Sequence, residues 1–167
     1  MGSIESKIHS ASKECLRRIL GVNECLLWVT NCREVTSFRR RYEVAGLYVF
    51  FDDDNIYYVG ETNNMARRVG NEHCDAHIGG SEGVVRFLMY YLEDIYGEYG
   101  RWRNEDAKGR ENIIKEILRE RIRGLKILII TCDRLKDVKV GNERKINSYR
   151  RRLEDCLIKE LKPILNY

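Results

Sequence analysis

Two runs rich in β-branched and aromatic residues stand close together in the chain, and their spacing constrains the fold more than any other feature. The first run covers residues 45–51 and the second covers residues 56–59, with the polar segment DDDN between them. Such runs favour strands, and a short polar segment between two of them favours a turn. The sequence therefore predicts a β-hairpin.

A further short apolar run, LKILIIT at residues 125–131, is also rich in β-branched residues. This pattern predicts a buried strand in the middle of a sheet, with the hairpin as its partner. Residues 22–38 are apolar in part but have no clean period. They fit either a strand or a buried helical turn.

Apolar residues at helical spacing predict helices elsewhere. The expected helices cover 4–20 with Gly21 at the end, 64–72 with Thr62 or Asn63 as the cap, 84–95, a run around 113–118 closed by Gly124, and 146–161 ended by Pro163. Strands and helices in this order predict an α+β fold. A chain of 167 residues is the size of one domain.

Composition narrows the class of protein. With 43% apolar residues, 34% charged residues and one proline, the chain is expected to be globular. No apolar stretch approaches the roughly 20 residues of a membrane span, and the N-terminus lacks a secretory leader. We therefore expect no membrane association and a cytoplasmic location.

Basic residues and cysteines carry further expectations. The net charge is only +4, but basic runs at Arg39–Arg41 and at Lys145 and Arg150–Arg152 fit either a polyanion or plain solvent. The six cysteines form no C-x-x-C pair, so most are expected to be buried thiols. Intracellular disulfides of a thermophile are the alternative.

Five elements in fixed order resemble the GIY-YIG nuclease family. They are GLY at 46–48, YVG at 58–60, ETNNMARR at 61–68, a histidine, and LEDCLIKELKPILN at 153–166. The resemblance covers most of residues 45–167. It implies a small three-stranded antiparallel sheet flanked by helices. Residues 1–44 then form a helical N-terminal extension packed on this core, and about 79–124 form a helical insertion.

The resemblance also implies an active site. Tyr48 matches the tyrosine beside the attacking water, and its pKa must be lowered from about 10 if it is to act as a phenolate. Tyr58 matches the second tyrosine, which positions water or phosphate. Arg68 matches the arginine that stabilises phosphoryl charge, and Arg67 is expected to contact backbone phosphate.

The late helix supplies the metal ligand in this family. Glu154 stands twelve residues before Asn166, as the family glutamate does before its asparagine. It flanks the apolar stripe of its helix, where a carboxylate can hold Mg²⁺, with Mn²⁺ as a substitute. Asp155 and Glu160 are rival carboxylates. Asn166 is expected to contact substrate.

The histidine departs from the family pattern. The family usually has it four residues after the arginine, and that position is Glu72 here. His73, one residue later, is the preferred proton acceptor, and His77 is expected to contact substrate. A zinc site of His73, Cys74 and His77 with a distant cysteine is a weaker alternative.

These features predict a metal-dependent endonuclease that hydrolyses phosphodiester bonds in nucleic acid, with DNA as the expected partner. Two alternatives stay open. One is a protein of the same fold that binds nucleic acid without cutting it. The other is a structural role in which these tyrosines and arginines only pack or face solvent. The sequence does not separate DNA from RNA.

Overall fold

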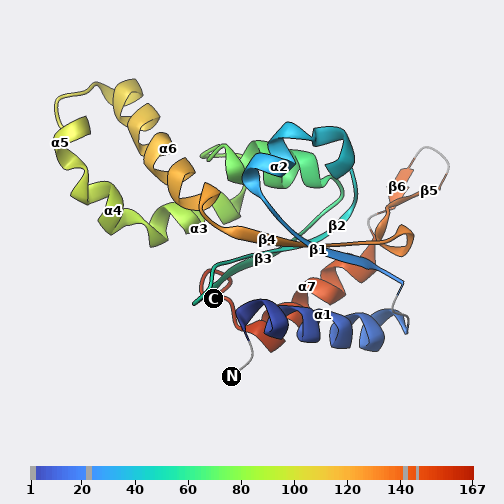
Figure 1. Ribbon diagram of the computed structural model, residues 1–167. Helices are drawn as coiled ribbons and strands as arrows, with labels where there is room; N and C mark the ends of the chain where they lie inside the picture. Colours follow the sequence, from blue (N-terminus) through green and yellow to red (C-terminus); the bar gives the residue numbers. More distant parts are fainter. Residues whose placement is uncertain (1–2, 22–23, 141–142, 146) are drawn as a thin grey trace.

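The computed structural model describes residues 3–21, 24–140, 143–145 and 147–167 (Figure 1). The elements in chain order are α1 (Ile4–Leu20), β1 (Leu26–Asn31), α2 (Cys32–Ser37), η1 (Arg39–Tyr42), β2 (Gly46–Phe51), β3 (Ile56–Thr62), η2 (Ala66–Cys74), α3 (Glu82–Tyr90), α4 (Leu92–Gly97), α5 (Tyr99–Trp102), α6 (Ala107–Arg123), β4 (Lys126–Thr131), η3 (Asp133–Leu135), β5 (Val138–Val140), β6 (Glu143–Lys145) and α7 (Ser148–Leu161). The fold is α+β, as the sequence predicts.

The central sheet is antiparallel and has the strand order β1-β4-β2-β3. The predicted hairpin is β2 and β3, and the predicted buried strand β4 pairs with β2. The expected three-stranded sheet is wrong, because β1 pairs along the other edge of β4. This fourth strand lies in the stretch that had no clean period, and it satisfies backbone groups that β4 would otherwise expose.

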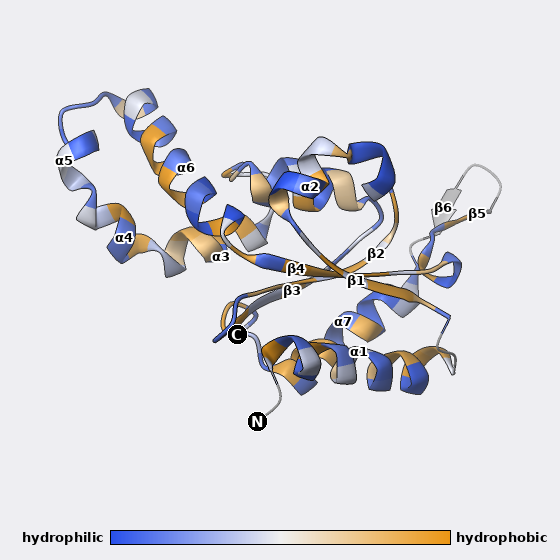
Figure 2. Cartoon of the chain, viewed as in Figure 1, coloured by the Kyte–Doolittle hydropathy of each residue, from blue (hydrophilic) through white to orange (hydrophobic). Residues whose placement is uncertain are grey.

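Helices cover both faces of the sheet (Figure 1). Alternate residues of β2 face opposite sides, as in any strand. Leu47, Val49 and Phe51 pack with α1 and α7, while Tyr48 and Phe50 pack with α2, η2, α3 and α6. Figure 2 shows the strands as largely hydrophobic, whereas the helices alternate between hydrophobic and hydrophilic residues along their length. The two cores therefore share one sheet.

Several predicted helix ends are confirmed. The first helix ends at Leu20, and Gly21 caps it with a left-handed φ of 69°. The last helix ends at Leu161, with Lys162 left-handed before Pro163. The stretch expected as one helix over 84–95 is instead α3 and α4, separated at Tyr91. Residue 146, the expected start of the last helix, lies outside the described residues.

The N-terminal 44 residues were expected to be a helical extension. They do contain α1, α2 and η1, but they also supply β1 to the central sheet. Helix α1 packs along α7 beneath the sheet. Helices α3 to α6, within the expected insertion at about 79–124, form an arm beside the sheet (Figure 1). Among the described residues, no helix is both long and apolar enough to cross a membrane.

The expectation of buried thiols is wrong, because all six cysteines form disulfides. The pairs are Cys15–Cys156, Cys25–Cys132 and Cys32–Cys74. They join α1 to α7, the residue before β1 to the residue after β4, and α2 to η2. Each bond links segments at least 42 residues apart, so periodicity along the sequence could not reveal the pairing.

Candidate active site

The hairpin brings the two tyrosines of the sequence motif together. The ring centroids of Tyr48 on β2 and Tyr58 on β3 are 6.1 Å apart. Tyr48 is directly opposite Gly60 in the ladder. A Cβ atom at Gly60 would lie 2.4 Å from the Tyr48 hydroxyl oxygen, so only glycine leaves room for this ring. The glycine of the YVG motif therefore has a packing role.

Helix η2 is a π-helix and carries the histidine. The Nε2 atom of His73 lies 2.9 Å from the hydroxyl oxygen of Tyr48, and both side chains are buried, at 1% exposed each. The rings of Phe50, Tyr58 and Phe87 also contact the imidazole, with centroids 5.4 to 6.2 Å away. His73 is thus fixed against the first tyrosine.

The π-helical geometry of η2 bears on the spacing of Arg68 and His73, which are five residues apart. In an α-helix, residues four apart lie on one face. A π-helix has i→i+5 hydrogen bonds, so residues five apart come to lie about one turn above each other. The wider turn is consistent with the effect of the Arg68 charge, which lowers the pKa of His73.

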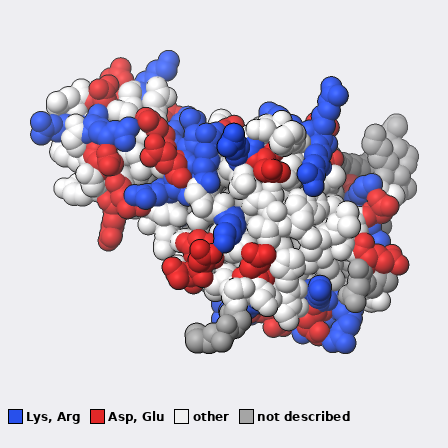
Figure 3. Space-filling view, in the orientation of Figure 1, with Lys and Arg blue, Asp and Glu red and all other residues white. Residues whose placement is uncertain are grey.

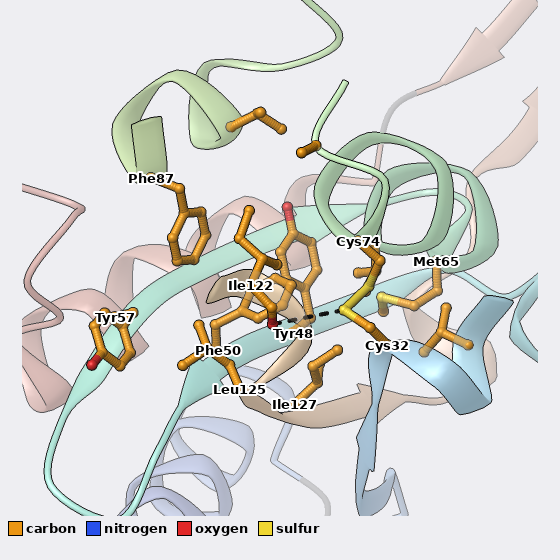
Figure 4. Packing of buried hydrophobic residues seen from close by; sticks show 14 of the residues in the cluster. Cys32, Tyr48, Phe50, Tyr57, Met65, Cys74, Phe87, Ile122, Leu125 and Ile127 are labelled. Atoms are coloured by element: carbon orange, nitrogen blue, oxygen red, sulfur yellow. Dashed lines mark hydrogen bonds between the residues drawn. A yellow bond between two sulfur atoms is a disulfide. The ribbon is translucent and has the colours of Figure 1, made fainter. Parts of the chain in front are cut away.

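Gly83, in the first turn of α3, leaves room for the ring of His73. A Cβ atom at Gly83 would lie 2.5 Å from Cε1 of His73 and 3.0 Å from Cζ of Tyr58. Gly83 therefore lets α3 close over the two rings. Figure 4 shows Phe87 of the same helix facing Tyr48 and Phe50 across this core.

The two predicted arginines share one carboxylate. Nη1 of Arg68 lies 2.7 Å from Oε2 of Glu72, and Nη1 of Arg67 binds Oε1 of the same group. Glu72 is buried, whereas the Arg67 side chain is 51% exposed. The two guanidinium groups border a cleft of about 400 Å³, lined by Glu61, Thr62, Asn63, Arg67, Arg68, Asp137 and Arg150.

Glu154 on α7 approaches from the other side of the edge strand β3. Burial, helped by the charges of Glu61 and Asp155 and opposed by the backbone of Glu61 and the charge of Arg151, raises the pKa of this carboxyl from 4.5 to about 7. Its charge in turn raises the pKa of Tyr48 and Tyr58. The carboxylate therefore acts at close range on the tyrosine pair.

The rival carboxylates on α7 are placed differently. Asp155 is exposed to solvent, and Glu160 is ion-paired with Arg18 at 3.1 Å. Among the described residues, Glu154 forms no ion pair, although it is half-buried. Of the three, Glu154 is the carboxylate that faces the tyrosines.

The protein's own groups do not favour a phenolate at Tyr48. Burial raises the pKa of Tyr48 well above 10, the charges of Tyr58, Glu154 and Glu72 raise it further, and only Arg68 lowers it. Burial and the charge of Arg68 lower the pKa of His73 to about 3. These residues alone do not produce the expected lowering of the Tyr48 pKa, which stays a prediction for the metal-bound site. Phenol and imidazole are both neutral at pH 7.

Arg150 was expected to belong to an exposed basic run, but it is 3% exposed. Its Nε donates to Glu61 at 2.6 Å, and its Nη1 donates to Asp137 at 2.6 Å and to the carbonyl oxygen of Leu135 at 2.8 Å. This clamp holds Glu61 near Glu154. Neither Glu61 nor Arg150 was a predicted site residue, and only the position of Glu61 directly after YVG could have pointed to it.

Asn166 and His77, the other predicted substrate contacts, have surroundings different from those of the tyrosine pair. The Asn166 carboxamide bridges the backbone of Val59, accepting from its N–H at 2.8 Å and donating to its carbonyl oxygen at 2.9 Å. It ties the C-terminal tail to β3. The His77 side chain is exposed, and within the described residues none of the ring contacts around His73 involves it.

The residues at this edge fit a hard divalent cation better than zinc. Cys74, Cys132 and Cys156 are all in disulfides, so the zinc alternative has no thiolate. A half-buried carboxylate with a raised pKa, and with a second carboxylate near it, has negative charge that a cation would stabilise. Mg²⁺ accepts one or two such carboxylates and retains several waters. The described residues contain no group of three or more His, Cys, Asp or Glu side chains arranged to hold a metal, so an ion at Glu154 would have to keep most of its ligands as water.

No family model, curated protein or solved structure matches this chain. A function for this chain therefore has to be inferred from its own residues and their geometry.

Proposed function

We propose that this chain is a metal-dependent endonuclease of the GIY-YIG type, which hydrolyses phosphodiester bonds in nucleic acid, with DNA as the expected substrate. The hydrogen bond between Tyr48 and His73, at 2.9 Å inside a buried ring cluster, is the observation that carries the proposal. Arg68 and Glu154 both act electrostatically on this tyrosine. A proton acceptor, a cation and a carboxylate therefore meet at one edge of the sheet.

In the proposed mechanism Tyr48 and His73 act as a proton relay. The attacking water gives a proton to the Tyr48 oxygen as the phenol proton moves to Nε2 of His73 along their hydrogen bond. No free phenolate forms, which suits a phenol whose pKa is raised. The bound phosphate is negative and lies near the imidazole, so it favours the imidazolium that results.

Arg68 is proposed to stabilise the charge that develops on the phosphoryl group. Its side chain is 29% exposed and borders the cleft, while Glu72 binds one of its guanidinium nitrogens. A planar guanidinium with several donors can keep Glu72 and still reach a phosphate oxygen. Arg67, the more exposed of the two, contacts the backbone phosphate next to it.

Glu154 would hold the Mg²⁺ ion, or Mn²⁺ in its place. Bound there, the ion would polarise the phosphate and stabilise the leaving oxygen. Glu61 is near enough to raise the pKa of Glu154, and the Arg150 clamp fixes its position. The chain's contribution is to hold Glu61, which lines the cleft, close to Glu154.

A cleavage assay tests the proposal. Labelled duplex, single-stranded, flapped and junction DNA, together with RNA, are incubated with Mg²⁺ or Mn²⁺ and with EDTA. We expect metal-dependent cutting by the native chain and loss of cutting in Glu154→Ala and Tyr48→Phe. Asp155→Asn, which removes an exposed carboxylate from the same helix, is the matched control and should cut like the native chain.

A binding protein that does not cut is the second candidate. The observation in its favour is that Glu72 occupies both Arg67 and Arg68, which lowers their availability to a phosphate. Salt-sensitive binding of DNA or RNA without cutting under any metal condition would support this candidate and overturn the nuclease. Absence of binding as well would favour a purely structural role.

We also propose a cytoplasmic location for this chain. Disulfides are rare in the cytosol except in thermophiles, and this chain has three. Counting free thiols in protein isolated without reductant tests the point. Six free thiols would show that the compartment keeps the chain reduced, and none would restrict a cytoplasmic location to a thermophilic source.

A further inference from the structure

Outside the cleft, four consecutive exposed residues form a basic turn with an aromatic side chain at its start. We call Phe38, Arg39, Arg40 and Arg41 the η1 turn. Phe38 is 59% exposed, and the three arginines are exposed as well. They line a cavity of about 740 Å³ together with Glu34, Thr36 and Ser37. In Figure 3, Lys and Arg side chains project from the part of the surface where Figure 1 places η1.

The guanidinium groups of this turn differ from those of several other exposed arginines. Exposed arginines such as Arg17, Arg101 and Arg121 are ion-paired with nearby carboxylates. Over the part of the chain that the structure describes, Arg39, Arg40 and Arg41 form no ion pair. Three adjacent positive charges are thus held together without carboxylate partners, which costs electrostatic repulsion and suits a polyanion.

The turn is held rigidly next to the candidate active site. Tyr42, at the end of η1, is fully buried, and its hydroxyl lies 2.7 Å from Oγ1 of Thr30. The Cys32–Cys74 disulfide joins α2, which precedes the turn, to the residue after His73 (Figure 4). The turn and the π-helix are therefore anchored to one another on the same side of the sheet.

We propose that the η1 turn is a second nucleic-acid contact, which holds an unpaired segment flanking the bond that the active site cuts. Phe38 offers an exposed aromatic face on which a base can stack, and the arginines offer charge to the phosphates beside it. Aromatic faces next to basic side chains are how proteins hold single strands without reading sequence. The inference rests on the proposed function, and it specifies a substrate with a single-stranded tail or flap.

Binding measured in EDTA separates this surface from catalysis. Fluorescence anisotropy compares a blunt duplex, the same duplex with an unpaired tail, and the tail alone, each over a range of salt concentrations. The native chain should bind the tailed duplex more tightly than the blunt one. Replacing Arg39, Arg40 and Arg41 with Gln should remove this preference. It should also lower the slope of log affinity against log salt by about 2, since each single-strand phosphate contact contributes roughly 0.7.

Matched variants separate the turn from net charge and from general loss of fold. Replacing Arg17, Arg101 and Arg121 with Gln removes the same charge from ion-paired positions and should leave the preference for the tail unchanged. Phe38→Leu should weaken binding of the tail roughly 5- to 100-fold without changing the salt slope, and Phe38→Tyr should restore it. Phe38→Tyr keeps an aromatic face at this position, whereas Phe38→Leu keeps only an apolar side chain.

The inference is overturned if the native chain does not distinguish tailed from blunt duplex, or if the η1-turn variants bind the tail like the native chain. Its failure is distinguishable from failure of the nuclease proposal. Metal-dependent cutting by the native chain, with normal binding by the η1-turn variants, would remove only the second contact. Loss of binding in those variants, with no cutting by the native chain, would support the surface and remove only the nuclease.

Discussion

Glu154→Gln should stabilise the metal-free protein at alkaline pH. Burial and nearby carboxylates raise the pKa of this group from 4.5 to about 7. A carboxyl with a raised folded-state pKa destabilises the fold most when it is ionised, above pH 7. The effect disappears as the pH falls through 7 toward 4.5. The difference in pKa corresponds to about 3 kcal/mol at pH 8, an upper estimate for a half-buried group.

Urea unfolding in EDTA at pH 5 and at pH 8, with the disulfides intact, measures this effect. Glu154→Gln should exceed the native free energy of unfolding by up to about 3 kcal/mol at pH 8, with little difference at pH 5. Asp155→Asn, its exposed neighbour, should change stability by less than about 0.5 kcal/mol at either pH. The comparison isolates the buried charge from the loss of a charge as such.

Added Mg²⁺ should favour the native chain over Glu154→Gln, the reverse of the effect expected in EDTA. If Glu154 holds the ion, Mg²⁺ at ten times its dissociation constant stabilises the native chain by about 1.4 kcal/mol and leaves Glu154→Gln unchanged. A variant less stable than the native chain at pH 8, or one that Mg²⁺ stabilises equally, would refute the reasoning. In the first case the carboxylate would be satisfied by the protein, and in the second the ion would bind elsewhere.

Three further predictions concern the site and its support. Tyr48→Phe should lower cleavage by about 100-fold or more, since general base catalysis contributes at least that much, while DNA binding in EDTA stays native; an active variant would remove the proton relay. Gly83→Ala should displace His73, because the new Cβ would lie 2.5 Å from its ring, and should lower the cleavage rate by about 100-fold in a folded protein; native activity would contradict the packing role. Arg150→Met should cost about 3–5 kcal/mol in urea unfolding, because it removes the buried cation that binds Glu61, Asp137 and the carbonyl oxygen of Leu135; a loss under about 1 kcal/mol would contradict the clamp.

Helices and strands were predicted correctly where all the residues that define an element lie within one short segment of the sequence. The first helix was predicted over 4–20 and is found over Ile4–Leu20, because its apolar stripe and its terminal glycine both lie within the segment. The hairpin was predicted for the same reason. Within the candidate site, the placement of Tyr48 and Tyr58 in two adjacent strands was enough to expect the tyrosine pair.

The predictions that failed depended on distant segments. The role of Arg150 could not be read from its basic neighbours, because Glu61 and Asp137 come from other elements. The binding of the Asn166 carboxamide to the backbone of Val59, far away in sequence, was likewise not foreseen, and its contact with substrate stays a prediction. The π-helix that carries His73 follows no pattern of apolar spacing.

The sequence by itself determined the helices, the hairpin and the order of the motif residues, since hydrophobic periodicity and turn chemistry act over a few residues. Only the tertiary structure decided that β1 completes the sheet, that all six cysteines pair, and that His73 meets Tyr48. The physical reason is that each of these contacts joins segments whose approach depends on how the whole core packs. A window of sequence contains one partner of such a contact and not the other.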